Sequence, residues 1–280
     1  MLGGKDTGQH ANAVAPMFRR YSAQEMARPV GNLVFLVDGL LVHPTYGQIA
    51  GPQKAMKSYV AMAIALGVSS GTPVMGHFTV PQPMPVVYYC GEGGERTFRR
   101  RLQRMASDSE ADLASLKLEA SFEAAPIPSP IFMNSLERDL AEVQPGLVVV
   151  DPYYAYHGGQ SRGSNLYEEG GLLSSLSGAC TAAGSGLLVV NHFNQTGSGT
   201  GLKRITQSGS AEWVDSWILL GHRQDPQVSS GRFFLQMDVG SRQWSGCNLN
   251  VDLRTGTFDP ATGTHRGQIA WTVRRSDARG

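Results

Sequence analysis

The chain has 280 residues, a hydrophobic content of 41%, 34 glycines and a formal net charge of +1. This length allows one sizeable hydrophobic core, and the glycines indicate many tight turns. The near-neutral charge excludes a protein that is cationic over its whole surface, so any contact with nucleic acid has to come from a local patch or loop.

The three cysteines, Cys90, Cys180 and Cys247, are far apart and lack CxxC spacing, which indicates neither a zinc site nor a disulfide framework. This pattern favours a cytoplasmic protein. No stretch approaches the roughly 18 uninterrupted apolar residues of a membrane span, and the N-terminus lacks the apolar segment of a signal peptide. We therefore expect a soluble protein without membrane contacts.

Residues 1–28 are expected to form an N-terminal arm, with a polar lead-in and a short basic helix that ends before Pro29. The sequence fits packing of this helix on its own domain and contact with a neighbouring subunit equally well. Residues 29–280 are expected to form one domain. From residue 33 to residue 221, apolar runs alternate with helical patterns, which is typical of βαβ units and a largely parallel sheet.

Two predicted strands of this domain are each followed by a predicted helix. The strand 46–51 ends in a glycine and precedes a helix over 57–71, whose apolar residues follow a helical period. A buried strand over 85–92 precedes a basic helix over 96–106.

The segment 107–145 is predicted to be a linker-like loop followed by a helix that is capped by Asn134 or Ser135. The last part of the chain, about 230–280, alternates apolar and polar residues around glycines. We expect antiparallel strands there, as an extension of an α/β core.

Residues 51–58, GPQKAMKS, match the phosphate-binding loop G-x-x-x-x-G-K-[ST] except at one position. The loop and the helix after it supply inward-facing N–H groups, Lys57 for the β- and γ-phosphates, and the Ser58 hydroxyl for Mg²⁺. Met56 stands where the last glycine is expected. We expect Met56 to keep helical dihedrals, with its side chain in a hydrophobic pocket away from the phosphates. From the loop alone, a chance glycine-lysine turn is the alternative.

Three other predicted strands end in polar residues that suit a hydrolytic P-loop site. The run 146–152 places Asp151 at a strand end, where an acid can act near Mg²⁺. The strand 85–92 ends in Glu92, which can activate or orient the attacking water. A third predicted strand, 186–192, ends in His192, which can sense the γ-phosphate.

Together these motifs resemble the RecA-like ATPases of the replicative-helicase branch, the hexameric plasmid RepA and DnaB-type group. Some bacterial and phage members of that group have a P-loop like GPPKSFKS, with a bulky residue at the glycine position. The resemblance covers roughly residues 33–260 and includes FLVDGLLV, YYCGEGGERTFRRRL, GLVVVDP, LLVVNHFNQTG and RITQSGSAEWVDSWILLGHR. It implies a RecA-like P-loop NTPase core with a mainly parallel twisted sheet flanked by helices, plus C-terminal antiparallel strands.

The resemblance also implies roles for individual residues. Lys57 would contact the phosphates, Ser58 and Asp151 would hold Mg²⁺, Glu92 would activate water, and His192 would couple the γ-phosphate to nucleic-acid loops. Lys54 matches the first lysine of the GPPK subgroup, and a solvated side chain is its alternative role. The expected ATP-binding residues are Gly51, Pro52, Gln53, Lys54, Ala55, Met56, Lys57, Ser58 and Tyr59.

In these ATPases a neighbouring subunit donates an arginine from a Lys-x-Arg pattern. The matching residue here is Arg242, with Gly240 in place of the lysine. Arg204 and Arg223 are runners-up, for which a surface salt bridge is the alternative. We expect single-stranded DNA at two loops, one with Arg162 and the other with Lys203 and Arg204; simple mobility of these loops is the alternative.

The sequence thus predicts an ATP-hydrolysing hexameric ring motor on single-stranded DNA, a replicative helicase of a plasmid, phage or mobile element. A RecA-like recombination or repair ATPase that does not unwind DNA is one alternative. A regulatory ATP-binding module with low turnover is another, because Met56 and Gly240 depart from the expected motifs.

Overall fold

The computed structural model describes residues 20–158, 166–193, 201–205 and 209–276, without the side chains of residues 166, 203 and 204. The chain divides into two units, Met1–Leu33 and Val34–Gly280. In the first unit, the single-turn helix α1 (Ala23–Met26) begins at a capping box, in which Ser22 and Glu25 bond each other's backbone N–H groups. This helix is shorter than the basic helix expected before Pro29.

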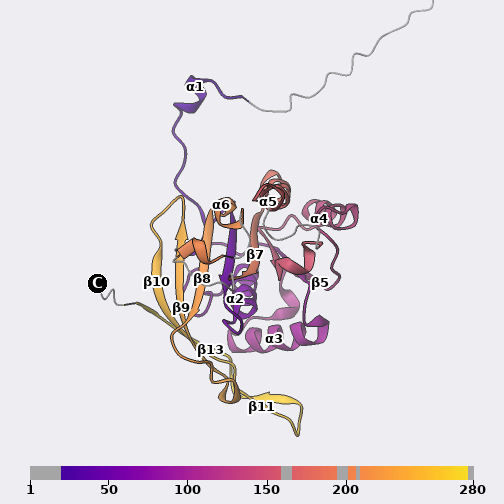
Figure 1. The fold of residues 1–280 in the computed structure, drawn as a ribbon, viewed down its shortest axis with the longest axis vertical. Coiled ribbons are helices and arrows are strands. Elements are labelled where there is room, and N and C mark those ends of the chain that lie inside the picture. The colour runs from indigo at the N-terminus through magenta and orange to yellow at the C-terminus, as the bar shows by residue number, and fades with distance from the viewer. Residues whose placement is uncertain (1–19, 159–165, 194–200, 206–208, 277–280) are drawn as a thin grey trace, which may run out of the picture. The chain divides into compact units, whose positions relative to one another are not determined.

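The second unit is built on a nine-stranded sheet in the order β13-β10-β9-β8-β3-β7-β6-β4-β5 (Figure 1). The strands from β8 to β5 are parallel, and β9, β10 and β13 continue the sheet in antiparallel pairs. This confirms the expected α/β core with antiparallel C-terminal strands. The nine strands are β3 (Tyr46–Gly51), β4 (Val86–Cys90), β5 (Leu118–Ser121), β6 (Leu147–Asp151), β7 (Gly186–His192), β8 (Ser216–His222), β9 (Arg232–Ser241), β10 (Cys247–Arg254) and β13 (Ala270–Arg275).

Two hairpins lie outside this sheet. β1 (Phe35–Val37) pairs with β2 (Leu41–Val42) just before the P-loop strand, and β11 (Thr257–Asp259) pairs with β12 (Thr264–Arg266) between β10 and β13. The second hairpin and helix α3 line opposite sides of one cavity.

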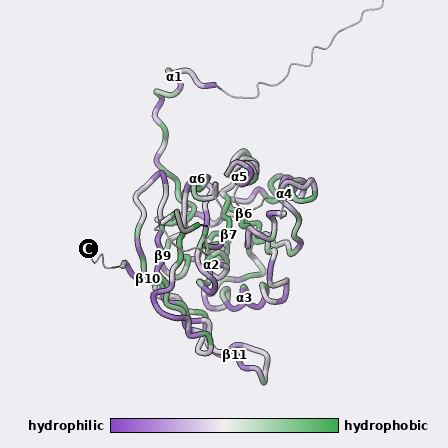
Figure 2. The backbone as a smooth tube through the Cα atoms, in the orientation of Figure 1, coloured by the Kyte–Doolittle hydropathy of each residue, from purple (hydrophilic) through white to green (hydrophobic). Residues whose placement is uncertain are grey.

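Helices cover both faces of the sheet. Alternate residues of the central strands point to opposite faces, so that Val149 packs under α2 and α3 while Val148 and Val150 pack under α4 and α5. Figure 2 shows these central strands as the hydrophobic part of the tube. The helices are α2 (Lys57–Ser70), α3 (Gly94–Asp108), α4 (Pro130–Glu142), α5 (Leu166–Ala182) and α6 (Ser210–Trp213).

The structure corrects the prediction for residues 107–145. Helix α4 is capped by Ser129, whose hydroxyl accepts the Phe132 N–H at 3.3 Å, and not by Asn134 or Ser135. Pro130 occupies the first helical position, where its missing N–H costs no hydrogen bond. Strand β5 also lies in this segment, which was expected to be a loop, and pairs with β4 at the edge of the sheet.

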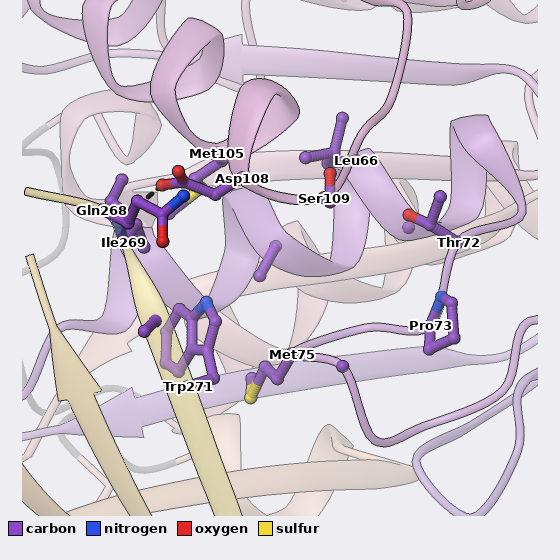
Figure 3. Close-up of a pocket in the computed structure, with 14 residues that line it drawn as sticks. Leu66, Thr72, Pro73, Met75, Met105, Asp108, Ser109, Gln268, Ile269 and Trp271 are labelled. Carbon is purple, nitrogen blue, oxygen red and sulfur yellow. Dashed lines mark hydrogen bonds between the residues drawn. The ribbon is translucent and has the colours of Figure 1, made fainter.

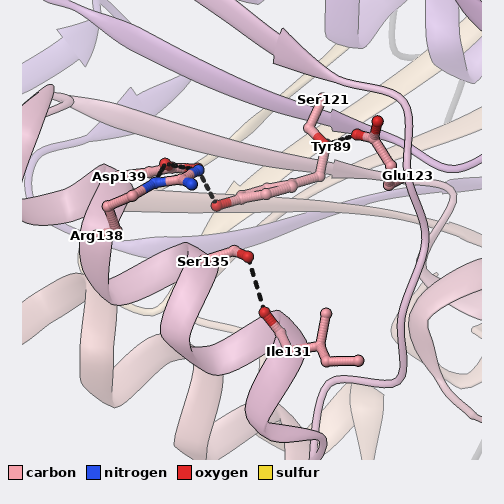
Figure 4. Close-up of polar contacts among 7 residues, drawn as sticks. All are labelled: Tyr89, Ser121, Glu123, Ile131, Ser135, Arg138 and Asp139. Carbon is pink, nitrogen blue, oxygen red and sulfur yellow. Dashed lines mark hydrogen bonds and ion pairs between the residues drawn. The ribbon is translucent and has the colours of Figure 1, made fainter.

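A polar contact fixes α4 on the sheet. The hydroxyl of Tyr89 on β4 donates to Asp139 of α4 at 2.7 Å, and Arg138 donates to the other oxygen of the same carboxylate (Figure 4). Because Tyr89 is otherwise packed in the core under α4, this bond satisfies the one polar atom that the ring buries.

On the opposite face, a cavity of about 370 Å³ separates α2 and α3 from β13 (Figure 3). Its lining is mostly apolar, with Met75, Met105 and Trp271 among its residues. The Asp108 carboxylate accepts the backbone N–H of Ile269 there, which ties the end of α3 to the start of β13.

Candidate active site

The P-loop connects the end of β3 to the start of α2 and adopts the expected strand, loop and helix order. Gly51 is required by the close approach of β8, because a Cβ atom at this position would lie 3.0 Å from the carbonyl oxygen of Leu220. Ala55 is fully buried in the loop, whereas Gln53 and Lys54 are exposed. The loop therefore exposes only part of its length to a ligand.

Met56 has left-handed backbone dihedrals, with φ 58° and ψ 28°. The expectation that it keeps helical dihedrals is therefore wrong, because the loop keeps a glycine-like conformation even though the residue is methionine. The side chain is partly buried against the hydrophobic core under α2, as expected. The left-handed conformation costs a residue with a Cβ atom roughly 1 kcal/mol, which this packing offsets.

We predict that Met56→Gly is more stable than Met56→Ala by about 1 kcal/mol. Both variants lose the same packing, but only glycine adopts a positive φ without penalty. Urea unfolding of the two variants measures this difference. Alanine equal to or better than glycine would show that residue 56 has the right-handed conformation of an ordinary helical turn.

The Lys57 ammonium group lies inside the loop. Its Nζ donates to the carbonyl oxygens of Gly51 and Pro52, at 3.0 and 2.9 Å, and lies 3.3 Å from Nδ1 of His192. Burial lowers the pKa of Lys57 to about 8, opposed by the charges of Asp151 and Glu92. The amine is thus held in place by loop carbonyls that a phosphate group can replace.

Ser58 and Asp151 form the predicted magnesium corner. The Ser58 hydroxyl donates to Asp151 Oδ1 at 3.1 Å, and the hydroxyl of Tyr88 on β4 donates to Oδ2 at 2.6 Å. Burial raises the pKa of Asp151, against the effect of both hydrogen bonds. Among the residues that the structure describes, no group of three or more His, Cys, Asp or Glu side chains forms a metal cage. Hydroxyl and carboxylate oxygens fit Mg²⁺, which usually keeps waters and takes its remaining ligands from phosphates.

Glu92 lies two residues beyond the end of β4 and faces the same corner. With Ser58, Asp151 and Arg101 it lines a small pocket of about 20 Å³, which is enough space for one water molecule. The hydroxyl of Tyr154 donates to Glu92 Oε2 at 2.7 Å. The side chains expected to bind Mg²⁺ and to activate water therefore surround one water-sized space.

His192 ends β7 beside the P-loop strand, since Gly51 and His192 are paired in the register of β3 and β7. Burial and the neighbouring charge of Lys57 lower the pKa of His192. Its ring lies 5.8 Å from the ring of Tyr154. His192 thus contacts Lys57 on one side and the segment after β6 on the other.

Arg242 lies away from this site. It follows Ser241, which pairs with Ser216 at the amino end of β8, whereas the P-loop is at the carboxyl end of the parallel strands. The guanidinium group bonds the backbone carbonyl of Glu212. Arg242 is therefore not part of the site of its own chain, and a role in a neighbouring subunit remains a prediction.

The absence of lysine at position 240 has a steric cause. A Cβ atom on Gly240 would lie 2.3 Å from the ring of Trp217 on the adjacent strand β8. The runner-up Arg223 forms an ion pair with Asp252 and also donates to the Leu235 carbonyl oxygen at 3.1 Å, which agrees with the salt-bridge alternative.

The structure describes little of the residues that were predicted to contact nucleic acid. Arg162 lies outside the described residues. Lys203 and Arg204 belong to a short 3₁₀ helix (Gly201–Arg204), and their side chains are not among those described. The loop that was predicted to carry Arg162 is shorter than expected, because a 3₁₀ turn follows β6 and α5 begins at Leu166.

Three arginines of α3 line a cavity of about 630 Å³ between α3 and the β11–β12 hairpin. Tyr59 of the P-loop helix and the exposed Phe258 are part of its wall. No aspartate or glutamate is among its described lining residues, and the Arg101 guanidinium lies 5.2 Å from the centre of the Tyr59 ring. The three arginines are Arg100, Arg101 and Arg104. Arg104 follows the other two by four and three residues, and this helical spacing was the sequence signal for a shared face.

A comparison with protein families matches the family described as AAA domain over residues 22–198, which is more than half of the chain and includes the P-loop, Glu92, Asp151 and His192. The chain belongs to the AAA domain family. The fold of this AAA domain is similar to that of a solved ATPase domain of another protein, with a TM-score of 0.53, 11% sequence identity and coverage of 79% of this chain and 84% of that chain. This similarity confirms the RecA-like fold.

A search of curated proteins found no match. Among the described residues of the AAA domain, no helix has the length and apolar character needed to cross a lipid bilayer.

Proposed function

We propose that the protein hydrolyses ATP with Mg²⁺ as a ring-forming motor on single-stranded DNA. The observation that carries the proposal is the meeting of five side chains at the carboxyl edge of adjacent parallel strands. Lys57 lies against His192, Ser58 donates to Asp151, and Glu92 shares a small pocket with that serine and aspartate. A P-loop ATPase needs a phosphate-binding lysine, a metal-binding hydroxyl and acid, and a water-activating carboxylate at this edge.

The proposed reaction begins with an exchange at Lys57. A β- or γ-phosphate oxygen replaces the carbonyl oxygens of Gly51 and Pro52 as the partner of the ammonium group. Loop N–H groups and the start of α2 bind the remaining phosphate charge. The large cavity lined by Tyr59 and Phe258 offers space, aromatic surface and positive charge beside this helix for the nucleoside.

Hydrolysis then depends on Glu92. Ser58 and Asp151 would hold Mg²⁺, and that ion would neutralise the negative charge that develops on the phosphates. The Ser58 hydroxyl and the Asp151 carboxylate orient this corner, and the Glu92 carboxylate accepts a proton from the water that attacks the γ-phosphate. The products are ADP and phosphate, and the proton leaves Glu92 to solvent, to which that residue is exposed.

Two features of the site support a second candidate function, that of a regulatory ATP-binding module with low turnover. Met56 holds a strained conformation in the loop, and Trp217 excludes the lysine expected at position 240. A RecA-like ATPase that acts in recombination or repair without unwinding uses the same site. The contacts within the site favour turnover, because Glu92 already lines a water-sized space with Ser58 and Asp151.

The test is ATP hydrolysis by the full chain with and without single-stranded DNA. We expect measurable turnover that rises at least severalfold with DNA, and a hexamer by mass measurement with a non-hydrolysable ATP analogue. Unwinding of a forked duplex then separates a helicase from a recombination-type ATPase. Binding of ATP without hydrolysis would support the low-turnover module and contradict the motor.

A further inference from the structure

We propose that Tyr154 is a positioning residue that aims the Glu92 carboxylate at the attacking water. This inference rests on the proposed ATP hydrolysis and adds a residue to it. Its starting point is the 2.7 Å hydrogen bond from the Tyr154 hydroxyl to Glu92 Oε2.

Glu92 needs such a partner because its own surroundings restrain it weakly. It is exposed, and it stands between Gly91 on one side and Gly93 and Gly94 on the other, two glycines with positive φ. Glycine gives the backbone many conformations, so a carboxylate in this turn has no fixed direction of its own. Within the described part of the chain, the Tyr154 hydroxyl is the only hydrogen-bond partner of the Glu92 carboxylate.

Tyr154 itself is held firmly. It is half-exposed, but its neighbours Tyr153 and Tyr156 in the same 3₁₀ turn are fully buried in the core under α4 and α5. The turn packs directly against the end of β4, because a Cβ atom on Gly91 would lie 2.6 Å from Ala155 and 2.8 Å from the Tyr156 ring. The tyrosine hydroxyl is thus presented from a rigid element at the position of the carboxylate.

The two oxygens of the Glu92 carboxylate have different roles. Oε2 accepts from Tyr154, and Oε1 stays available for water in the pocket that Glu92 shares with Ser58 and Asp151. Burial, together with the hydrogen bond to Glu92 and the charge of that residue, raises the pKa of Tyr154 to about 12, so the hydroxyl remains a donor at neutral pH. A fixed direction matters because a general base acts only within hydrogen-bond reach of the proton it removes.

The test is Tyr154→Phe, which keeps the ring and its packing beside His192 and removes only the hydroxyl. We expect kcat for ATP to fall about tenfold, with KM, the affinity for a non-hydrolysable ATP analogue and the melting temperature unchanged. The matched control is Tyr156→Phe on the same turn, whose hydroxyl is 3.4 Å from the Glu123 carbonyl oxygen and not near the Glu92 carboxylate. Its kcat should stay within twofold of wild type.

A kcat within twofold of wild type for Tyr154→Phe would overturn the inference. A fall in kcat accompanied by a higher KM or a lower melting temperature would also overturn it, because it would show a structural role. These outcomes are distinct from failure of the proposed function, in which the wild-type protein itself does not hydrolyse ATP.

Discussion

Replacement of Lys57 by alanine is expected to reduce ATP hydrolysis by about 10²- to 10³-fold and to weaken ATP binding. Lys57 is the buried cation of the loop, and within the described part of the chain its ammonium group is bound only by carbonyl oxygens and the His192 ring. Without Lys57, the interior of the loop provides no cationic side chain. The bound phosphates and the negative charge that develops during attack are then both less stabilised. Steady-state kinetics and titration with a fluorescent ATP analogue measure the two effects.

The matched control for this prediction is Lys54→Ala. Lys54 lies on the same loop and carries the same charge, but its side chain is exposed. We expect its kcat and ATP affinity to stay within about twofold of wild type, since exposed charges contribute little energy. Equal turnover in wild type and Lys57→Ala would contradict the whole interpretation of the P-loop.

Glu92→Gln is expected to separate binding from hydrolysis. Glutamine has nearly the same shape and can still accept the Tyr154 hydroxyl, but it cannot take a proton from water at neutral pH. We expect kcat to fall by about 10²- to 10³-fold, while the affinity for ATP changes less than threefold. Single-turnover hydrolysis with excess protein measures the chemical step directly.

Glu95→Gln is the control for Glu92→Gln. Glu95 is only three residues away, on the first turn of α3, and forms an exposed ion pair with Arg99. Its replacement should leave kcat unchanged. If Glu92→Gln retains wild-type turnover, another group activates the water and the role of Tyr154 fails together with that of Glu92.

The parts of the fold that local patterns determine were predictable. The strand 46–51 and the strand 186–192 have the predicted bounds, because continuous apolar runs that end at glycine or a polar residue indicate buried parallel strands. Helix α2 ends at Ser70, within one residue of the prediction, because Gly71 stops it with a left-handed φ of 78°.

Other features depend on tertiary contacts that no local pattern contains. The strand β5 is a short, partly polar edge strand whose only signal is its pairing with β4. The bond between Tyr154 and Glu92 joins residues 62 positions apart. The sequence identified Glu92 from its place after a buried strand, but it could not show which side chain restrains it. The Met56 conformation was predicted wrongly because the loop, and not the residue, sets its dihedrals.

The contact between Trp217 and Gly240 has a consequence for how related chains can differ. A lysine at position 240 would place its Cβ atom within the volume of the indole ring. A chain with Trp217 therefore cannot acquire that lysine by one substitution without displacing the indole ring from its place over Gly240 of β9. The two positions are expected to change together through an intermediate with a small residue at 217, so that lineages with the tryptophan and lineages with the lysine are separated by at least two steps.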